Sequence, residues 1–309
     1  MEFPNLVGYV FTVSLFTLLI ASVFVTQIQP IYAQVDINGK DNITDSNSSH
    51  NDVLLITKIL AKNLENYLQK TGALLGLTSS LPQVRNVSYA HFLNQTLDTL
   101  HGIPKDADIQ KRQVAQSILS NYKDLQIIIF IMPNGDIYFD EPYSRQQAST
   151  TTNLAFRDYV KGVFRTNDTY LGDPTPSASS GQMQAVISIP VYSLKDNATI
   201  VGAWAGGIDF NVLNNELQSL NLTSDGKRVV YVGHNGQKVA DSDINKSKTP
   251  ESFADLNSFK NAINGESGST IDRIGNTKMM VTYQPINAFH NTWVVLLMQS
   301  NNTTIDNNR

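Results

Sequence analysis

The chain of 309 residues contains no cysteine. Disulfide frameworks, thiolate zinc sites and cysteine nucleophiles are therefore excluded. The sequence also lacks an excess of positive charge, because 23 Lys and Arg residues stand against 27 Asp and Glu, and no stretch gathers the cations into a basic patch. This balance leaves no electrostatic footprint for nucleic acid, so we expect no nucleic-acid partner.

Catalytic and metal-binding signatures are also missing. The sequence has five histidines and contains neither HExxH nor GxSxG, the patterns of zinc proteases and of nucleophile elbows. Residues 241–252 space their oxygen atoms like a calcium loop, but Lys246 stands where the turn needs glycine and Ser252 where a bidentate glutamate belongs. The sequence therefore predicts no catalytic residue, no metal site, no cofactor and no enzymatic activity.

The longest apolar run lies near the N-terminus. Leu6–Val25 carries no charged side chain, and a run of about 20 such residues is long enough to span a bilayer. A small residue, Ala33, marks a signal-peptidase junction, so residues 1–33 are either a cleaved signal peptide or a retained transmembrane anchor. Both alternatives place the rest of the chain outside the cytoplasm, anchored to the cell membrane or secreted. The Asn-X-Ser/Thr sequons, for example at Asn86 and Asn94, agree with export.

A long helix is predicted after a polar linker over residues 34–50. Apolar residues recur at helical spacing from Val53 to Leu68 and form one stripe. We therefore expect a stalk helix over 51–84. Its apolar face packs on its own domain or pairs with a second copy in a homodimer, and the sequence leaves both alternatives open.

Two later stretches share one pattern. "LQIIIFIMPNGDIYFD" (125–140) and "KRVVYVGHNGQKVADSD" (227–243) each predict a strand, an Asn-Gly turn of type I′ and a second strand. Each is followed by a polar helical segment and two more strands, and Pro190 and Pro285 fall late in the first strand of each pair, where an edge or strand end tolerates proline. The repeat predicts two antiparallel modules over 85–220 and 221–300, and residues 301–309 form a polar tail. The fold class is α+β.

The first module carries a candidate pocket. Arg157 offers a planar fork of donors that can hold a carboxylate through two hydrogen bonds. Tyr159 and Tyr170 supply apolar faces with hydroxyl groups, the mixture expected in a small-molecule site. The alternatives are a structural ion pair of Arg157, with Asp140 or Asp158, and core packing of the two tyrosines.

The order of these segments resembles the double-Cache family, the extracellular sensor domains of chemoreceptors and sensor histidine kinases. The matching segments include "PNGDIYFDEP", "FRDYVKGVFRTNDTYLGD" and "IVGAWAGGIDFNVL" in the first module, and "HNGQKVADSD" and "VTYQPI" in the second. The resemblance covers 51–300. It implies two PAS-like modules with antiparallel sheets on a long N-terminal helix, and a small ligand in the first, membrane-distal module.

The amino-acid-binding members of that family use an Arg-X-Trp element, one tyrosine upstream, one downstream and a late aspartate. The resemblance implies that Arg157 is the arginine, that Tyr159 takes the tryptophan position and that Tyr170 is the downstream tyrosine. The upstream tyrosine would fall near Thr152, which does not match. The aspartate aligns with Gly207, so we take Asp209, two residues later, as its substitute.

We assign three more residues to the ligand-binding set: Tyr138, Asp140 and Ser188. The predicted function is extracytoplasmic sensing of a small molecule, which is a carboxylate-bearing metabolite, an amino acid or an amine. The sensor would have no output domain of its own and would need a separate membrane signalling partner. The alternative is a surface structural, adhesion or protein-interaction module without a small ligand.

Overall fold

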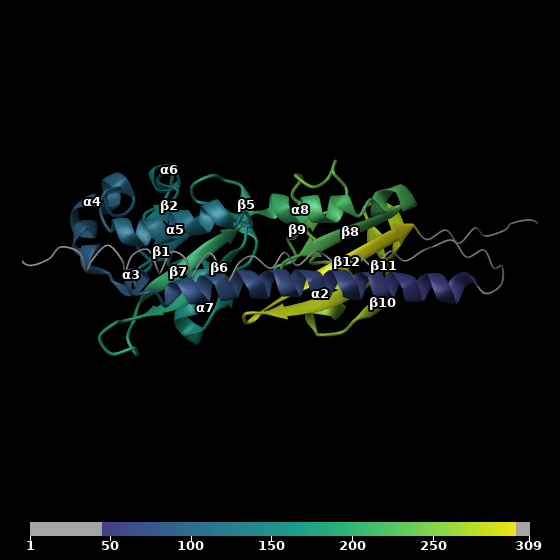
Figure 1. The fold of residues 1–309 in the computed structure, drawn as a ribbon. Helices are drawn as coiled ribbons and strands as arrows, with labels where there is room; N and C mark the ends of the chain where they lie inside the picture. The colour runs from purple at the N-terminus through teal and green to yellow at the C-terminus, as the bar shows by residue number, and fades with distance from the viewer. Residues whose placement is uncertain (1–44, 301–309) are drawn as a thin grey trace, which may run out of the picture. The chain divides into compact units, whose positions relative to one another are not determined.

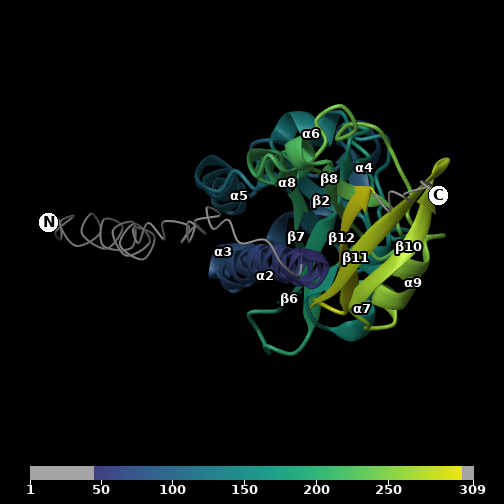
Figure 2. The same cartoon turned by 90° about the vertical axis from the view of Figure 1, so that its right-hand side faces the viewer.

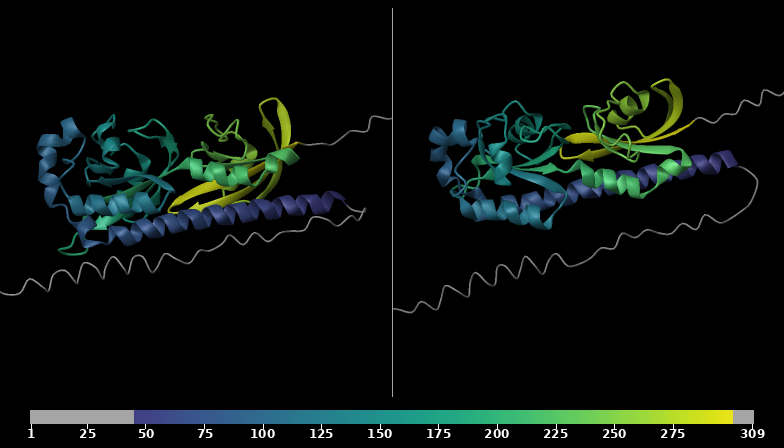
Figure 3. Two further views of the ribbon diagram at one scale, coloured as in Figure 1. Left: turned by 45° about the horizontal axis from the view of Figure 1, so that its top comes forward. Right: turned by 90° about the horizontal axis from the view of Figure 1, so that it is seen from above.

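The computed structural model describes residues 45–300. The predicted apolar segment Leu6–Val25, the start of the polar linker and the tail over 301–309 lie outside the described residues. Within 45–300, no helix is both long and apolar enough to cross a membrane. Two five-stranded antiparallel sheets lie along one long helix (Figures 1 and 3). This arrangement confirms the α+β fold class.

The stalk helix, α2, runs over Asp45–Ser79. It ends before Pro82 because a residue that precedes proline is pushed out of the helical region, and Leu81 is extended, with φ −65° and ψ 137°. A separate short helix, α3, then covers Pro82–Arg85. The helix expected over 51–84 is thus broken near its end.

The distal module follows α3. It contains the 3₁₀ helix η1 (Ser88–Phe92) and the helices α4 (Leu93–Leu100), α5 (Ile109–Asn121), α6 (Tyr143–Gln147) and α7 (Asp158–Thr166). Its sheet has the order β2-β1-β7-β6-β3, with β1 Leu125–Ile131, β2 Ile137–Glu141, β3 Tyr170–Leu171, β6 Val186–Tyr192 and β7 Ile200–Ile208. Strands β4 (Thr175–Pro176) and β5 (Met183–Gln184) pair separately.

The second, proximal module follows. We group α8 (Phe210–Ser219) with it, although the predicted boundary lies after residue 220, because α8 packs on β9; the 3₁₀ helix η2 (Leu222–Asp225) comes next. Its sheet has the order β10-β11-β12-β8-β9, with β8 Lys227–Val232, β9 Lys238–Asp241, β10 Gly268–Ile274, β11 Thr277–Ala288 and β12 Asn291–Ser300. Helix α9 (Asn257–Ile263) lies on the side of this sheet away from α2 (Figure 2).

The two predicted hairpins are present, but their turns are not type I′. A type I′ turn needs positive φ at both central residues. In the structure only the glycines have positive φ, Gly135 at 92° and Gly236 at 80°, and each closes a four-residue turn by donating its amide to the residue three before it. A Cβ on Gly135 would lie 2.5 Å from the Cβ of Ala155, and one on Gly236 would lie 2.6 Å from the Cβ of Ala254. In both modules the turn glycine therefore packs against an alanine about 20 residues later in the chain, Ala155 in the first and Ala254 in the second.

The two strand prolines lie where the prediction expects them. Strand β3 pairs with β6 only at Ser188 and Ile187, so Pro190 lies beyond its reach. Strand β10 begins opposite Tyr283, two residues before Pro285, so Pro285 lies beyond the pairing. Neither proline interrupts the hydrogen bonds of its outer neighbour.

The largest core joins α2 to both sheets. It contains Leu68 and Leu75 of α2, Trp204 of β7 and Trp293 of β12, all fully buried. The indole Nε1 of Trp204 donates a hydrogen bond of 3.0 Å to the hydroxyl of Thr78 on α2. The apolar face of the stalk helix thus packs on its own domain, while pairing with a second copy stays a prediction.

We predict that Gly72→Ala destabilises the protein although it improves the helix propensity of α2. A Cβ at Gly72 would lie 2.2 Å from the ring of Phe289, at the turn between β11 and β12. Overpacking of this kind costs about 1–3 kcal/mol. Gly76→Ala is the matched control, because its Cβ would meet only Ile189 at 3.8 Å and should gain up to about 1 kcal/mol. Thermal unfolding of both variants tests this, and equal effects would contradict it.

Candidate functional site

One row of paired residues crosses the distal sheet. Asp140 of β2 pairs with Ile129 of β1, Ile129 with Ala205 of β7, Ala205 with Ser188 of β6, and Ser188 with Tyr170 of β3. Directly paired residues of neighbouring antiparallel strands point to the same face of a sheet. Three of the predicted site residues therefore share one face, with Ile129 and Ala205 as an apolar floor between them.

Helix α7 covers this face and carries Tyr159, while Arg157 directly precedes it. The guanidinium of Arg157 donates hydrogen bonds to the hydroxyl of Thr175 at 2.6 Å and to the carbonyl of Pro176 at 2.9 Å. Its Nε is buried and has no partner. Within the described residues Arg157 forms no ion pair, so the predicted alternative of an ion pair with Asp140 or Asp158 is not what the structure shows.

A second guanidinium, not predicted from the sequence, lies beside the group. Arg145 of α6 donates from Nε to the hydroxyl of Ser179 at 2.7 Å and from Nη2 to that of Ser177 at 3.1 Å. The two arginines thus hold the loop between Thr175 and Ser179 against the module. The acceptors are neutral hydroxyl and carbonyl groups, which bind a guanidinium less strongly than a carboxylate does.

Two polar side chains on this face are buried without partners. Asp140 is 3% exposed and Ser188 is fully buried, and neither Asp140 Oδ1 nor Ser188 Oγ has a hydrogen-bond partner. Burial raises the pKa of Asp140 to about 7, although Arg145 and Arg112 oppose the shift. Unsatisfied buried polar atoms cost stability. The face therefore has unused capacity for hydrogen bonds.

The two tyrosines line the same face. Burial raises the pKa of Tyr159, while Arg157 opposes the shift and Asp140 adds to it. Both charges therefore lie near the hydroxyl of Tyr159. Tyr170 packs against Gly162 of α7, where a Cβ would lie 2.4 Å from its ring, and stacks on His290 with 6.4 Å between ring centroids.

The structure separates Tyr138 from this group. Tyr138 lies in the core that faces α2, and its hydroxyl donates to Asp108 Oδ2 at 2.7 Å. The Lys111 Nζ lies 4.3 Å from the centroid of its ring. Its side chain is satisfied by these protein groups.

Asp209 also lies apart from the group. It caps α8, where its Oδ1 accepts a hydrogen bond of 3.0 Å from the amide of Asn211. It lines a cleft of about 560 Å³ between the two modules, together with Lys238 and Glu251. The position expected to supply an ammonium acceptor is therefore not on the sheet face under α7.

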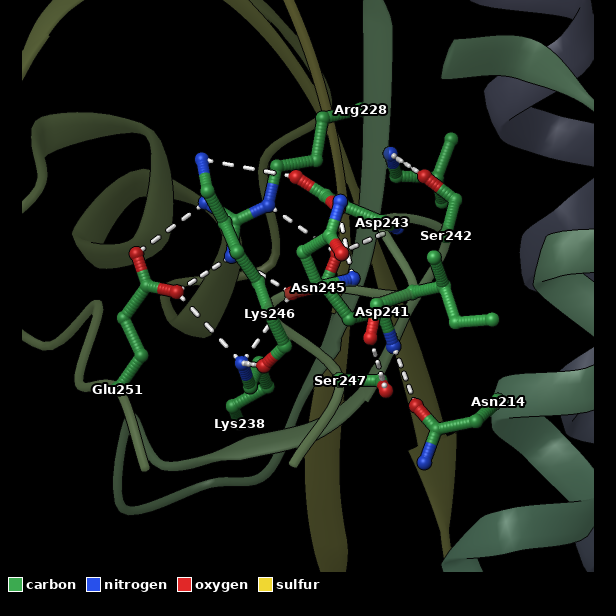
Figure 4. A network of polar contacts seen from close by, with 12 residues as sticks. Asn214, Arg228, Lys238, Asp241, Ser242, Asp243, Asn245, Lys246, Ser247 and Glu251 are labelled. Carbon is green, nitrogen blue, oxygen red and sulfur yellow. Dashed lines mark hydrogen bonds and ion pairs between the residues drawn. The ribbon is translucent and has the colours of Figure 1, made fainter. Parts of the chain in front are cut away.

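The corresponding face of the proximal module contains a buried ion cluster (Figure 4). Asp241 accepts hydrogen bonds from Arg228 Nη2 at 2.6 Å and Nε at 3.1 Å, and its Oδ2 lies 3.1 Å from Lys238 Nζ. Glu251 pairs with both cations. Burial by itself would raise the pKa of Asp241, but the hydrogen bonds and charge of Arg228 and the amide of Asp243 lower it. Within this cluster the two cationic side chains therefore neutralise the two carboxylates.

The ion cluster uses the first carboxylate of the calcium-like loop considered over residues 241–252. The first carboxylate of that loop, Asp241, is held by two cationic side chains. Within residues 45–300 no group of His, Asp or Glu side chains could hold a metal ion. The loop is therefore part of the cluster.

Because the two modules repeat one topology, the position of Arg157 has a counterpart in the proximal module. Arg157 and Leu256 each precede the module's covering helix in the same conformation, with φ −69° and ψ 141° against φ −68° and ψ 140°. Each donates its amide to the residue three before it, Leu154 and Phe253 respectively. Because leucine occupies this position in the proximal module, the fold does not require a guanidinium there.

Two modules of repeated topology on one long helix define a tandem PAS-like fold. Residues 40–306 match the family model of the Cache domain, and the chain belongs to this family. The double-Cache resemblance of the sequence is thereby confirmed. No curated protein sequence matches the chain.

Solved structures of similar fold are ligand-binding domains of chemoreceptors. That of Pseudomonas fluorescens CtaA with L-isoleucine has a TM-score of 0.57 and 14% identity, covering 82% of this chain and 93% of its own. That of Pseudomonas aeruginosa PctB with L-Arg has a TM-score of 0.57 and 11% identity, covering 85% and 100%. That of PctC from the same organism with GABA has a TM-score of 0.55 and 17% identity, covering 81% and 99%. At these identities the likeness shows the fold. The family and these structures are ligand-binding domains rather than enzymes.

Proposed function

We propose that the chain is an extracytoplasmic sensor domain that binds a small, carboxylate-bearing metabolite under α7 of its distal module. Arg157 holds the carboxylate, and Tyr159 and Tyr170 form the walls. The observation that carries the proposal is the contrast between the modules: Arg157 lies where the proximal module has Leu256. A buried Nε without a partner and a guanidinium bound only to neutral acceptors are suited to receive an anion.

The ligand class follows from the pocket and agrees with the similar structures. The sheet face is apolar in its centre and polar at its rim, as small-molecule sites are. CtaA, PctB and PctC were solved with L-isoleucine, L-Arg and GABA, all of which contain a carboxylate and an amino group. We therefore place amino acids and related amino-carboxylates first among the candidate ligands.

The signal would pass from the pocket to the stalk helix through one turn of the proximal module. Leu171, next to Tyr170 on β3, donates its amide to the carbonyl of Phe289 at 3.1 Å. The ring of Phe289 in turn packs on Gly72 of α2. A ligand that favours one position of β3 would thus bias α2 in proportion to its differential affinity for the two states. A membrane signalling partner would then respond to α2.

We expect Arg157→Leu to lower the affinity for a carboxylate ligand at least tenfold without unfolding the protein. Leucine is the residue that the repeat tolerates at this position, so the variant removes the guanidinium and keeps the backbone. The measurement is calorimetric titration of the 309-residue chain in detergent with amino acids, small carboxylates, amines and purines. Arg165→Leu, an exposed position of the same helix, is the matched control. Unchanged affinity in Arg157→Leu would place the site elsewhere, and absence of binding by every compound would favour the adhesion alternative.

A further inference from the structure

The internal repeat identifies a counterpart for Asp140. In the distal module Ile129 pairs with Asp140, and the register shifts between Phe130 and Ile131. In the proximal module Val230 pairs with Asp241, and the register shifts at the corresponding step. Asp140 and Asp241 therefore occupy the same position of the same hairpin, on the face that the covering helix packs against.

The two aspartates have opposite surroundings. The cations that neutralise Asp241 are Arg228, two residues before Val230, and Lys238, the partner of Val232. In the distal hairpin the position two residues before Ile129 is Ile127, and the partner of Ile131 is Ile137. Both are buried isoleucines. The distal module thus keeps the carboxylate and replaces both of its built-in cations with hydrocarbon.

Within the described residues, no ion pair to the Asp140 carboxylate takes the place of those made by these cations, although Arg145 and Arg112 act on it electrostatically. Asp140 forms no ion pair with any described residue. Its Oδ1 has no hydrogen-bond partner, although Asp140 is only 3% exposed. The guanidinium of Arg145, the cation that acts most on Asp140, is engaged by Ser177 and Ser179. Removing a carboxylate from water without a partner is costly, so the distal pocket favours a cation that comes from outside.

We infer that Asp140 is the acceptor for a cationic group of the ligand, a protonated amine that takes the place held by the Lys238 ammonium in the proximal module. This inference rests on the proposed function, in which Arg157 holds the carboxylate. Asp140 lies on the sheet face that α7 covers, and Arg157 directly precedes α7, so the two ends of a small amino-carboxylate can bind at one site. The ligand class is then an amino acid or a short ω-amino acid.

Ser188 contacts a different part of the ligand. Three strand spacings separate β2 from β6 in the sheet, which amounts to about 14 Å at about 4.8 Å per step. One ammonium group cannot reach both Asp140 and Ser188. The amine end of the ligand is therefore assigned to the β2 side of the floor, with Asp140 alone as its charged partner.

The first test compares ligands that differ only in the amino group: L-leucine with 4-methylpentanoate, and 4-aminobutanoate with butanoate. Calorimetry of Asp140→Asn should show the affinity of an amino compound reduced at least tenfold and that of its deaminated partner changed less than threefold. Arg157→Leu should weaken both partners equally. Equal effects of Asp140→Asn on both, or no effect, would overturn the inference and leave the proposed function intact. A loss confined to Asp140→Asn, with Arg157→Leu unchanged, would support the amine subsite and refute the carboxylate clamp.

The second test needs no ligand. Ile137→Lys places an ammonium where Lys238 stands in the proximal module, three residues before the aspartate. At pH 8 we expect its thermal midpoint to lie above that of Ile137→Met, the uncharged control of similar length, and Asp140→Asn should remove the difference. A midpoint below the control would overturn the inference, because it would show that the pocket at Asp140 does not accept a cation. If no amino compound binds, the assignment of an amine ligand is overturned whatever the stability result.

Discussion

Replacing Arg228 with methionine should lower the free energy of unfolding by about 3–5 kcal/mol, the usual cost of removing one partner of a buried ion pair. Asp241 is fully buried and accepts two hydrogen bonds from Arg228. Methionine fills much of the same volume but cannot donate, so the carboxylate keeps only Lys238 and the amide of Asp243. Urea denaturation at pH 7 measures the effect.

A double variant separates the lost charge from lost packing. In Arg228→Met with Asp241→Leu, the uncompensated carboxylate is gone, and similar replacements of buried ion pairs are often neutral. We therefore expect the double variant to be more stable than Arg228→Met alone. A loss below about 1 kcal/mol in the single variant would show that the cluster tolerates an unpaired Asp241.

Asp140→Asn should stabilise the ligand-free protein at neutral and alkaline pH. Burial raises the pKa of Asp140 to about 7, against an ordinary value near 3.9 in the unfolded chain. The folded state therefore holds a proton that the unfolded state releases, and wild-type stability falls as pH rises from about 4 to 7. The full cost, about 4 kcal/mol for a shift of about three pKa units, is present above pH 7.

The pH profile of unfolding measures this effect. The charged groups that act on Asp140 are Arg145 of α6, Arg112 of α5 and Glu141 of its own strand, and none of them changes in the variant. Asp140→Asn should remove the fall in stability between pH 4 and 7. Asp241→Asn is the matched control with the opposite sign, because the pKa of Asp241 is lowered and its charge stabilises the fold above the unfolded pKa. Parallel wild-type and Asp140→Asn profiles would contradict the prediction.

The sequence was sufficient for the repeated topology because local patterns determine it. Alternating apolar strands around Asn134-Gly135 and Asn235-Gly236 predicted two hairpins, and both are present. The turn type was wrong, because each loop is one residue longer than a two-residue type I′ loop and only the glycine has positive φ. Hairpin existence depends on the flanking strands, whereas turn type depends on how the chain continues into a bulge.

The proposed site was harder to predict because it depends on contacts that are distant in sequence. The group of Arg157, Tyr159, Tyr170 and Ser188 shares the face under α7, and Asp140 joins it through cross-strand pairing. Alternation along β2 does not reveal that Tyr138 faces α2, because the strand is buried on both sides and its register shifts within the hairpin. For such strands the hydrophobic pattern carries no information about the face.

Two further features gave little sequence signal. Arg145 lies in the five-residue helix α6, which is too short for periodicity to place its side chain. The partners of Asp241 are spread from residue 228 to residue 251, so the ion cluster exists only after the loop over 241–252 has folded back. The one clue was the repeat itself, which aligns Ile137 with Lys238 and Arg157 with Leu256.

Hydrogen–deuterium exchange with and without saturating L-leucine, or the tightest binder of the compound panel, tests most directly where the ligand binds. We expect slower exchange in β2, the first turns of α7 and the segment from β3 to β5, which surround the proposed site. Residues 228–252 of the proximal ion cluster should exchange at an unchanged rate. Protection confined to that cluster, or to the cleft lined by Asp209 and Lys238, would contradict the assignment of the ligand to the distal module.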